Sequence, residues 1–270
     1  MEEPFAQAWS TIRVIRDGPL VEVSLHRPDA RNALDATLMA ELTSFARAVR
    51  RRSDVLAVIL TGDADYFSAG ADLSARRERD ARRPTLLERR EAVMAGPDLC
   101  QAWEDIEAVT ICAVEGYCIG GGCALALACD WRILGQGAYF RLPEVPLGMN
   151  MSWTSVPRLT TLIGPARAKR FVIFGEAADA ATALAWGMAD DVAGKGEALE
   201  TARAWARKVC ALPPLPVRMT KAAVNAQATA LHQASGQMDR DQFLLASGSA
   251  DYREGVKAFF EKRPGNFKGD

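Results

Sequence analysis

Two segments rich in small residues, at positions 67–73 and 116–124, could together bind one oxygen atom. Each follows an apolar run typical of a buried strand, and the second opens a run of small apolar residues typical of a helix. Glycine and alanine let a ligand come close to the backbone, and the N–H groups at a helix start have no partner within the helix. Two such N–H groups that point at one oxygen form an oxyanion hole, which stabilises the negative charge that develops there during acyl chemistry.

These segments lie among elements that alternate between strand and helix. Continuous apolar runs predict buried strands at 55–61 and 109–114, and shorter patterns predict strands at 20–25 and 131–134. Asp35 is predicted to cap a helix between the first two strands, because apolar residues recur on one face of the segment that follows it. The apolar positions of this helix are Leu38, Leu42, Phe45 and Val49. This order of elements predicts an α/β domain with crossover connections.

The chain beyond residue 164 has a mostly helical pattern. The predicted helices lie at 165–174, 179–186, 197–212 and 216–230. Prolines between 212 and 216 mark a break. We therefore expect a core domain at 1–195 and a helical region at 196–270.

Composition and charge narrow the class of protein. The chain has 270 residues, 49% of them hydrophobic, so it can bury a large core. Lys plus Arg is 33 and Asp plus Glu is 34, which argues against a nucleic-acid partner. No apolar run reaches the roughly 18 residues of a membrane helix, and the acidic start lacks the apolar stretch of a signal peptide. We expect a cytoplasmic protein with no membrane partner.

The cysteines are expected to be reduced and buried. The six thiols belong to Cys100, Cys112, Cys118, Cys123, Cys129 and Cys210. They form no Cys-x-x-Cys pair, and most lie in apolar runs, where cysteine acts as a small hydrophobic residue. With only two histidines in addition, no metal site is expected.

A basic stretch between Arg76 and Arg90 allows two interpretations. It holds seven arginines interleaved with acidic residues. A solvated surface segment would have this pattern. A basic rim that attracts the phosphate groups of a ligand would have it as well.

Several motifs in order make the chain resemble the crotonase superfamily, the enoyl-CoA hydratase and isomerase family. The resemblance runs nearly end to end and includes both small-residue segments. The other matching motifs are Arg27-Pro28, Asn32-Ala33-Leu34, Leu142-Pro143-Glu144, Leu147-Gly148, Arg253-Glu254-Gly255 and Phe259-Phe260-Glu261-Lys262-Arg263. One such motif alone would be weak evidence, whereas all of them in the family's order are specific.

This resemblance implies a fold, an assembly and a substrate. The fold would be a spiral of ββα units with a C-terminal helical oligomerisation region. The assembly would be a homotrimer or a dimer of trimers. The substrate would be an acyl-CoA thioester, with coenzyme A as part of the substrate and no further cofactor. By position, the backbone N–H groups of Ala71 and Gly121 would form the oxyanion hole.

The number and position of the acidic residues distinguish the reactions that members of the family catalyse. Family hydratases usually carry one glutamate two residues after the glycine triplet and a second one twenty residues later. Here these positions hold Ala124 and Glu144. Hydration needs an acid and a base, and the loss of one typically costs 10²–10⁴ in rate. A proton shift from C2 to C4 needs one carboxylate, and several Δ3,Δ2-enoyl-CoA isomerases resemble this arrangement.

The segment after Glu144 departs from the hydratase pattern. Trp153, Thr154 and Ser155 replace small residues or glycines, so we expect a smaller or reshaped acyl pocket. Ser152 stands where some dienoyl-CoA isomerases have an aspartate, which argues against that subclass.

These observations favour a Δ3,Δ2-enoyl-CoA isomerase with Glu144 as its lone acid/base. The first alternative is an enoyl-CoA hydratase, or a hydratase-lyase that acts on aromatic enoyl-CoA with the same glutamate. The second is an acyl-CoA-binding protein without turnover.

The resemblance also implies residues that bind the substrate. For coenzyme A it points to the backbones of Ala69 and Ala71 and to the side chain of Leu73. Arg27 and Arg31 are expected near the phosphates.

Further substrate-binding positions are expected on other segments. Phe259 and Lys262 match residues that in relatives reach the coenzyme A of a neighbouring subunit. Tyr117 and Gly120 are expected beside the acyl group. Asp72 is expected near the ligand, although its main role, like that of Asp130 and Glu115, is predicted to be structural.

Overall fold

The computed structural model describes residues 4–72 and 84–270. The prediction for Leu73 and most of the basic stretch that starts at Arg76 therefore lie outside the described residues. Arg90, at the other end of that stretch, forms an exposed ion pair with Asp241, with 2.8 Å between Nε and Oδ1.

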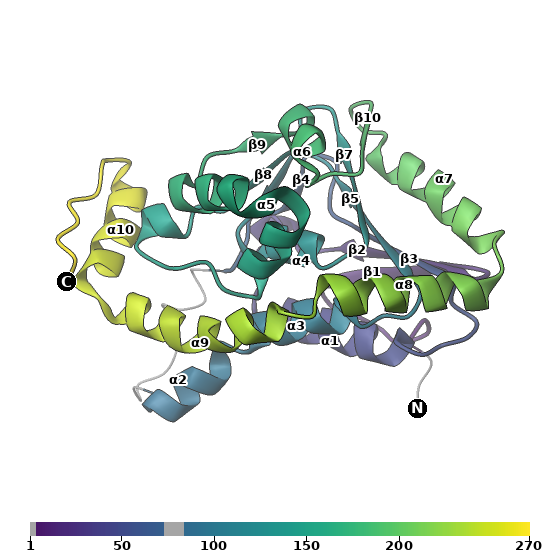
Figure 1. The fold of residues 1–270 in the computed structure, drawn as a ribbon, viewed down its shortest axis with the longest axis horizontal. Helices are drawn as coiled ribbons and strands as arrows, with labels where there is room; N and C mark the ends of the chain where they lie inside the picture. Colours follow the sequence, from purple (N-terminus) through teal and green to yellow (C-terminus); the bar gives the residue numbers. More distant parts are fainter. Residues whose placement is uncertain (1–3, 73–83) are drawn as a thin grey trace.

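A six-stranded sheet forms the larger layer of the fold (Figure 1). The strands, in their order across the sheet, are β1 (Ile12–Asp17), β2 (Leu20–Leu25), β3 (Ala57–Thr61), β5 (Val109–Val114), β7 (Trp131–Gly135) and β10 (Asp191–Ala193). β1 is antiparallel to β2, and the remaining neighbours are parallel. Every residue of β3 and β5 is buried, which explains their continuous apolar runs. All four strands predicted from the sequence are present.

A second sheet, which the sequence did not predict, has four short strands. They are β4 (Tyr66–Ser68), β6 (Tyr117–Ile119), β8 (Tyr139–Arg141) and β9 (Ala178–Asp179). β4 overlaps the start of the first small-residue segment, and β6 lies inside the second, so both segments hold a short strand that the sequence pattern did not indicate. Along the chain, one strand of the larger sheet is repeatedly followed by one strand of the smaller sheet and then a helix. This order of ββα units confirms the expected crotonase-like α/β fold.

The helices follow the predicted order, with corrections at their ends. They are α1 (Ala36–Val49), α2 (Leu86–Ala92), α3 (Ala95–Glu104), α4 (Gly121–Leu127), α5 (Ser155–Phe174), α6 (Ala180–Trp186), α7 (Ala198–Cys210), α8 (Pro214–Ala228), α9 (His232–Gly248) and α10 (Ala250–Glu261). Asp35 caps α1 as predicted, since its Oδ1 accepts a hydrogen bond of 2.8 Å from the Leu38 N–H. α5 was predicted to start at residue 165, but Gly164 and Pro165 form a kink inside it. α9 and α10 were not delimited one by one, but they lie in the region 196–270 that was predicted to be helical.

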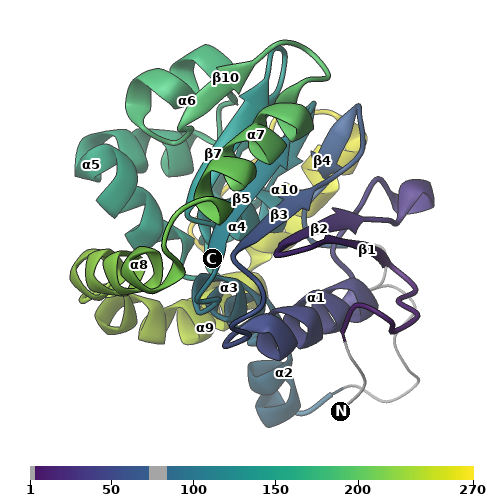
Figure 2. The ribbon, with the colours of Figure 1, turned by 90° about the vertical axis from the view of Figure 1, so that its right-hand side faces the viewer.

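The larger sheet has a hydrophobic layer on each face. Val58 and Leu60 of β3 pack into the layer shared with α1, α3 and α4. Ile59, which points the other way, packs with Ala202 and Ala206 of α7. Figure 2 shows α7 in front of these strands and α4 behind them. α4 is thereby packed against one face of the larger sheet.

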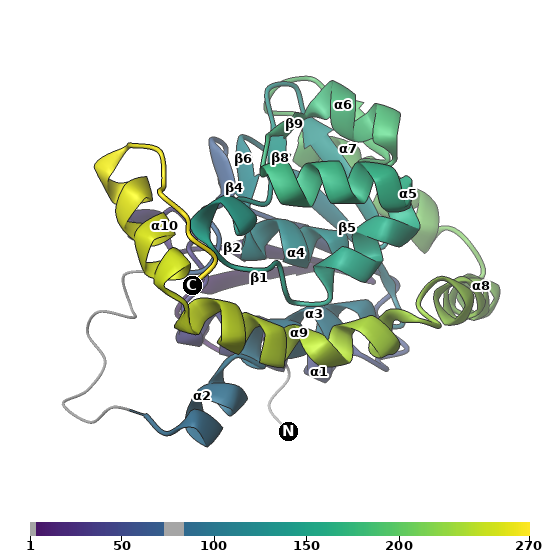
Figure 3. The same cartoon turned by 60° about the vertical axis from the view of Figure 1, so that its left-hand side comes forward.

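The last three helices run along the outside of this core. α8 and α9 follow one another past α3 (Figure 1), and α10 packs against the 3-10 turn η2 (Val145–Leu147) (Figure 3). The approach is close, because a Cβ on Gly148 would lie 2.7 Å from the carbonyl oxygen of Asp251. The domain boundary near residue 195 stays a prediction. α7, which lies beyond it, packs on the larger sheet. In the described part of the chain, no helix is both long and apolar enough to cross a membrane.

Candidate active site

Glu144 lies where the chain leaves β8 and enters η2, directly against the start of α4. A Cβ added to Gly120 would lie 2.8 Å from Oε1 of Glu144. Gly120 also has φ 53° and ψ −122°, a conformation that residues with a side chain avoid. Glycine at this position therefore lets the carboxyl group touch the backbone beside the N–H of Gly121.

Burial sets the protonation of Glu144. Its Oε2 is buried and has no hydrogen-bond partner in the part of the chain that the structure describes. Removal from water raises the pKa of Glu144 to about 7, although Arg141 favours the charged form. A carboxyl group that titrates near neutral pH can both take up and return a proton.

Two backbone N–H groups near this carboxyl are available as donors. Gly121 is the first residue of α4, so its N–H has no acceptor within the helix. Ala71 forms an isolated parallel bridge with Leu34, in which Leu34 donates to the Gly70 carbonyl and the Asp72 N–H donates to the Leu34 carbonyl. This pattern leaves the Ala71 N–H pointing away from Leu34.

The backbones that carry these two donors touch each other. A Cβ on Gly70, which has φ 91°, would lie 2.9 Å from the carbonyl oxygen of Ile119. Among the described residues, neither the Ala71 nor the Gly121 N–H donates a hydrogen bond to the protein. Both N–H groups are therefore available as donors, that of Gly121 at the positive end of a helix, and their joint role as an oxyanion hole stays a prediction.

Gly121 and Gly122, the other two glycines of the triplet, leave room for side chains from other segments. A Cβ on Gly121 would lie 2.6 Å from the indole of Trp153, and one on Gly122 would lie 2.6 Å from Cβ of Ser68. The hydroxyl of Ser68 donates to the Asn32 carbonyl and accepts from the Gly70 N–H. Ser68 thus holds the loop that carries Ala71.

No second carboxylate acts on Glu144 among the residues that the structure describes. Arg141 is the charged group that influences its titration. Ala124, where a hydratase of the family usually has a glutamate, is fully buried. Burial raises the pKa of the Cys123 thiol, and the nearby Glu144 carboxyl raises it further. The site therefore holds one group that can transfer a proton.

Arg27 braces the loop that follows Ala71. Its Nη1 lies 2.9 Å from Oδ2 of Asp72 and donates to the Ala33 carbonyl, and its Nε lies 3.2 Å from Oδ2 of Asp35. This network confirms a structural role for Asp72. A role of Arg27 and Asp72 in substrate binding stays a prediction, because the Arg27 guanidinium already has two carboxylate partners.

The remaining predicted binding residues lie on three different segments. Arg31 is exposed, and its carbonyl accepts from the Ala69 N–H, so these two positions are adjacent to Ala71. Tyr117 stacks on Tyr66 of β4, with ring centroids 5.7 Å apart. This contact places Tyr117 in an aromatic ladder along the smaller sheet, and its part in binding stays a prediction.

Phe259 and Lys262 lie at the exposed end of α10. Phe259 is 55% exposed, and Lys262 ends the helix in a left-handed conformation with φ 52°. Both are accessible, as contact with another subunit's ligand would need, but no described contact links them to Glu144. Their role also stays a prediction.

Two further carboxylates predicted to be structural are confirmed as such. Asp130 accepts hydrogen bonds from Thr110 and forms an ion pair with Lys221, at 2.6 Å between Nζ and Oδ2. Glu115 accepts from the Ala198 N–H at the start of α7. The six cysteines are free thiols, and all except the half-buried Cys210 are buried.

Sequence reasoning missed the residues that hold the Trp153 turn. Trp153 and Thr154 both have positive φ, at 63° and 57°. Oδ2 of Asp239 accepts from the Thr154 N–H at 2.8 Å, and Arg158 Nη1 donates to the Trp153 carbonyl at 2.9 Å. Asp239 lies in α9, far along the chain, so no local pattern could have revealed it.

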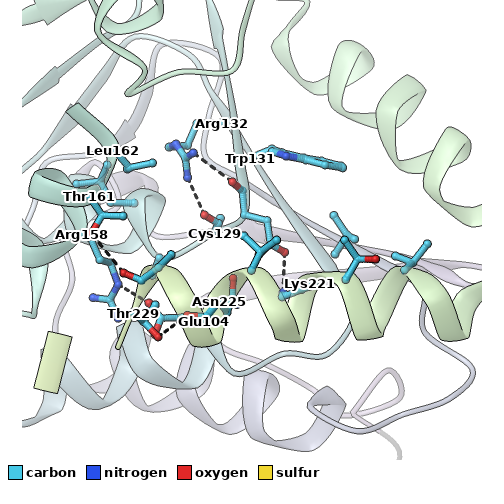
Figure 4. Close-up of a pocket in the computed structure, with 18 of the residues that line it drawn as sticks. Glu104, Cys129, Trp131, Arg132, Arg158, Thr161, Leu162, Lys221, Asn225 and Thr229 are labelled. Carbon is cyan, nitrogen blue, oxygen red and sulfur yellow. Dashed lines mark hydrogen bonds and ion pairs between the residues drawn. The ribbon is translucent and has the colours of Figure 1, made fainter. Parts of the chain in front are cut away.

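A separate cavity of about 640 Å³ lies between α8 and the larger sheet (Figure 4). Its charged lining residues include Lys221 and Asp130, and Arg158 with its partner Glu104, both as ion pairs. Glu144 does not line it. The cavity is thus distinct from the candidate active site.

Comparisons with known proteins agree with this geometry. The sequence profile of the family described as Enoyl-CoA hydratase/isomerase matches residues 16–270. The 2,3-dehydroadipyl-CoA hydratase of Escherichia coli K12 is 34% identical over 263 residues, which cover 96% of this chain and 99% of that protein.

Solved structures show the same fold. The enoyl-CoA hydratase of Bacillus anthracis superposes with a TM-score of 0.76 at 31% identity, covering 97% of this chain and 100% of that one. An enoyl-CoA hydratase from Mycobacterium avium subsp. paratuberculosis superposes with a TM-score of 0.85 at 23% identity, covering 97% and 100%.

Proposed function

This chain belongs to the enoyl-CoA hydratase/isomerase family, and from that premise we propose that it is a Δ3,Δ2-enoyl-CoA isomerase. The observation that supports the proposal is the single buried carboxyl group of Glu144 beside two available backbone N–H groups. One such group suffices for a proton shift, whereas hydration also requires a water molecule to be activated and a proton to be delivered.

In the proposed reaction, the thioester oxygen accepts hydrogen bonds from the N–H groups of Ala71 and Gly121. The ionised carboxylate of Glu144 takes a proton from C2 of the 3-enoyl-CoA, and the electron pair of the broken C–H bond delocalises onto the thioester oxygen. Glu144 then returns the proton to C4, and the double bond lies between C2 and C3. Atoms and charge balance without any further reactant.

Two features would lower the barrier of this reaction. Each oxyanion donor typically contributes about 2.7–4 kcal/mol when it is positioned for the charged intermediate. The pKa of Glu144, at about 7, is close to the pH at which the protein would work, which is favourable for a group that must first accept and then donate a proton.

The second candidate is an enoyl-CoA hydratase. It is favoured by the names of similar proteins, such as the 2,3-dehydroadipyl-CoA hydratase and the enoyl-CoA hydratase of Bacillus anthracis. Against it stands the buried Ala124, which leaves Glu144 to handle both the water and the α-carbon. A hydratase-lyase acting on aromatic enoyl-CoA, or a protein that binds acyl-CoA without turnover, would use the same pocket.

A paired assay distinguishes these functions. Purified protein receives 3-enoyl-CoA or 2-enoyl-CoA in deuterated water. Products are separated by chromatography against 2-enoyl and 3-enoyl standards, which have the same mass, and added water or deuterium is measured by mass spectrometry. The isomerase forms the 2-enoyl product from the 3-enoyl substrate and no 3-hydroxyacyl-CoA. Appearance of 3-hydroxyacyl-CoA from the 2-enoyl substrate would instead establish a hydratase.

The variant Glu144→Gln is the control for this assay. It should lose turnover on either substrate while it still binds a saturated acyl-CoA. Wild-type protein that binds acyl-CoA but turns over neither substrate would favour the binding protein.

We also propose assembly into a homotrimer or a dimer of trimers. Its support is a set of exposed large apolar side chains on and beside α8 and α9, which water contact disfavours. They are Leu212, Leu215, Met219, Val224, Leu231, Met238 and Leu245. The mass in solution, measured by light scattering, should correspond to three or six chains, and a monomer would contradict the proposal.

A further inference from the structure

Trp153 is held in an unfavourable backbone conformation next to the candidate oxyanion hole. Two consecutive residues with side chains, Trp153 and Thr154, have φ of 63° and 57°. Such conformations cost free energy and persist where the surrounding structure enforces them. Here three helices hold the turn. Asp239 of α9 accepts a hydrogen bond from the Thr154 N–H, and Arg158 of α5 donates to the Trp153 carbonyl. Arg158 is in turn paired with Glu104 of α3.

The indole that this turn presents lies between the starts of two helices. A Cβ on Gly121, the first residue of α4, would lie 2.6 Å from Cη2 of Trp153, and one on Gly96 near the start of α3 would overlap the indole. Both positions are glycine, so the ring packs directly on each backbone. It therefore fills the space between α3 and α4.

This location relates the indole to the acyl group of the substrate, and the following step rests on the proposed function. The carbonyl oxygen binds at the Gly121 N–H, and C2 and C4 must both reach Glu144, which touches the neighbouring Gly120. The first carbons of the acyl group are thus confined to the start of α4. The indole on Gly121 stands at the edge of that space.

We propose that Trp153 forms the end wall of the acyl pocket and restricts the protein to short acyl chains. The wall is rigid, because the bracing by Asp239 and Arg158 opposes rotation of the turn that carries it. Its replacement by alanine would open a cavity on the order of 150 Å³, which is large enough for a benzene-sized apolar group. A longer acyl chain could then extend between α3 and α4.

The test measures binding of saturated acyl-CoAs, so it needs no turnover. Calorimetry gives the Kd of butyryl-CoA and decanoyl-CoA for wild type, Trp153→Ala and the milder Trp153→Leu. One methylene in a tight apolar pocket is worth about 10–200-fold. We therefore expect wild type to bind butyryl-CoA at least about tenfold more tightly than decanoyl-CoA. Trp153→Ala should lose that preference.

The controls separate this proposal from neighbouring explanations. Trp205→Phe alters a tryptophan that packs on Trp131 at the other face of the sheet, and it should keep the wild-type ratio of Kd values. The ratio of the two Kd values, measured on one variant, does not change when the variant merely loses stability. Equal binding of both ligands by wild type, or an unchanged ratio in folded Trp153→Leu and Trp153→Ala, would overturn the proposal. Absence of isomerase activity would leave this binding result untouched.

Discussion

Replacing Glu144 by glutamine is expected to stabilise the fold at alkaline pH. Burial raises the pKa of Glu144 from 4.5 to about 7, so the folded state binds this proton more tightly than the unfolded chain does. Below pH 4.5 both states are protonated and the group costs nothing. Above pH 7 the folded state must hold a buried carboxylate, and its free energy of unfolding is lower by up to about 3 kcal/mol, at about 1.4 kcal/mol per pH unit between the two pKa values. Glutamine has no such penalty.

The assay is urea unfolding of both proteins at one fixed concentration, because assembly also contributes to stability. Glu144→Gln should exceed wild type by about 3 kcal/mol at pH 8 and by less than about 1 kcal/mol at pH 5. Glu91→Gln, at an exposed position of α2, is the matched control for the change from glutamate to glutamine. A Glu144→Gln protein that is equally or less stable than wild type at both pH values would refute the reasoning, since the carboxyl would then not be penalised by burial.

Three further predictions concern the same region. The kcat/KM for a 3-enoyl-CoA should rise tenfold per pH unit up to about pH 7 and then level off, because Glu144 must be ionised to act as the base; a flat profile in stopped assays from pH 5 to 9 would contradict this. Gly120→Ala should lower kcat/KM at least about tenfold, because the added Cβ, 2.8 Å from Oε1, would displace the carboxyl, and φ 53° disfavours a side chain there; a kcat/KM within about twofold of wild type would contradict this. Arg158→Leu should lower the free energy of unfolding by about 3–5 kcal/mol, because it leaves the Glu104 carboxylate without the ion pair that has 2.7 Å between Nε and Oε2; a loss below about 1 kcal/mol in urea would show that water solvates Glu104.

Patterns within a single element allowed much of the fold to be predicted. The strands β3 and β5 are buried on both faces, so runs made mostly of apolar residues marked them without any knowledge of their neighbours. The cap of α1 was equally local, because Asp35 acts on a residue three positions away. Such signals need no tertiary contact to be interpreted.

The second sheet could not be predicted in this way. Its strands are two or three residues long, too short for an alternating pattern to stand out. They are strands because neighbouring strands in the fold supply their hydrogen bonds, as where Cys118 of β6 pairs with Phe140 of β8. The start of α5 was predicted wrongly for a related reason. Gly164, with φ 76°, kinks a longer helix, and several residues in the first half of that helix are buried against the rest of the fold.

In the candidate site, too, the residues within local motifs could be predicted, and those held by distant contacts could not. Glu144 and Gly121 stood out because the residues around them form recognisable motifs, and the structure brings both to the start of α4. The turn at Trp153 depends on Asp239, which is 85 residues from Thr154, and two consecutive left-handed residues there have no glycine or asparagine to signal them. Only the folded chain shows why that tryptophan can face the site.

The glycine triplet explains why stability and activity are opposed at this site. Gly120, Gly121 and Gly122 each lack a side chain where another segment needs the space, for the Glu144 carboxyl, the Trp153 indole and the Ser68 side chain. The packing that follows removes water from Glu144, which destabilises its charged form and raises its pKa into the range useful for proton transfer. A better-solvated glutamate would make the fold more stable above pH 7 and a weaker base toward the substrate. The loss of stability above pH 7 and the raised pKa both come from the burial of Glu144. A variant that exposes this carboxyl to water must therefore gain stability and lose basicity together.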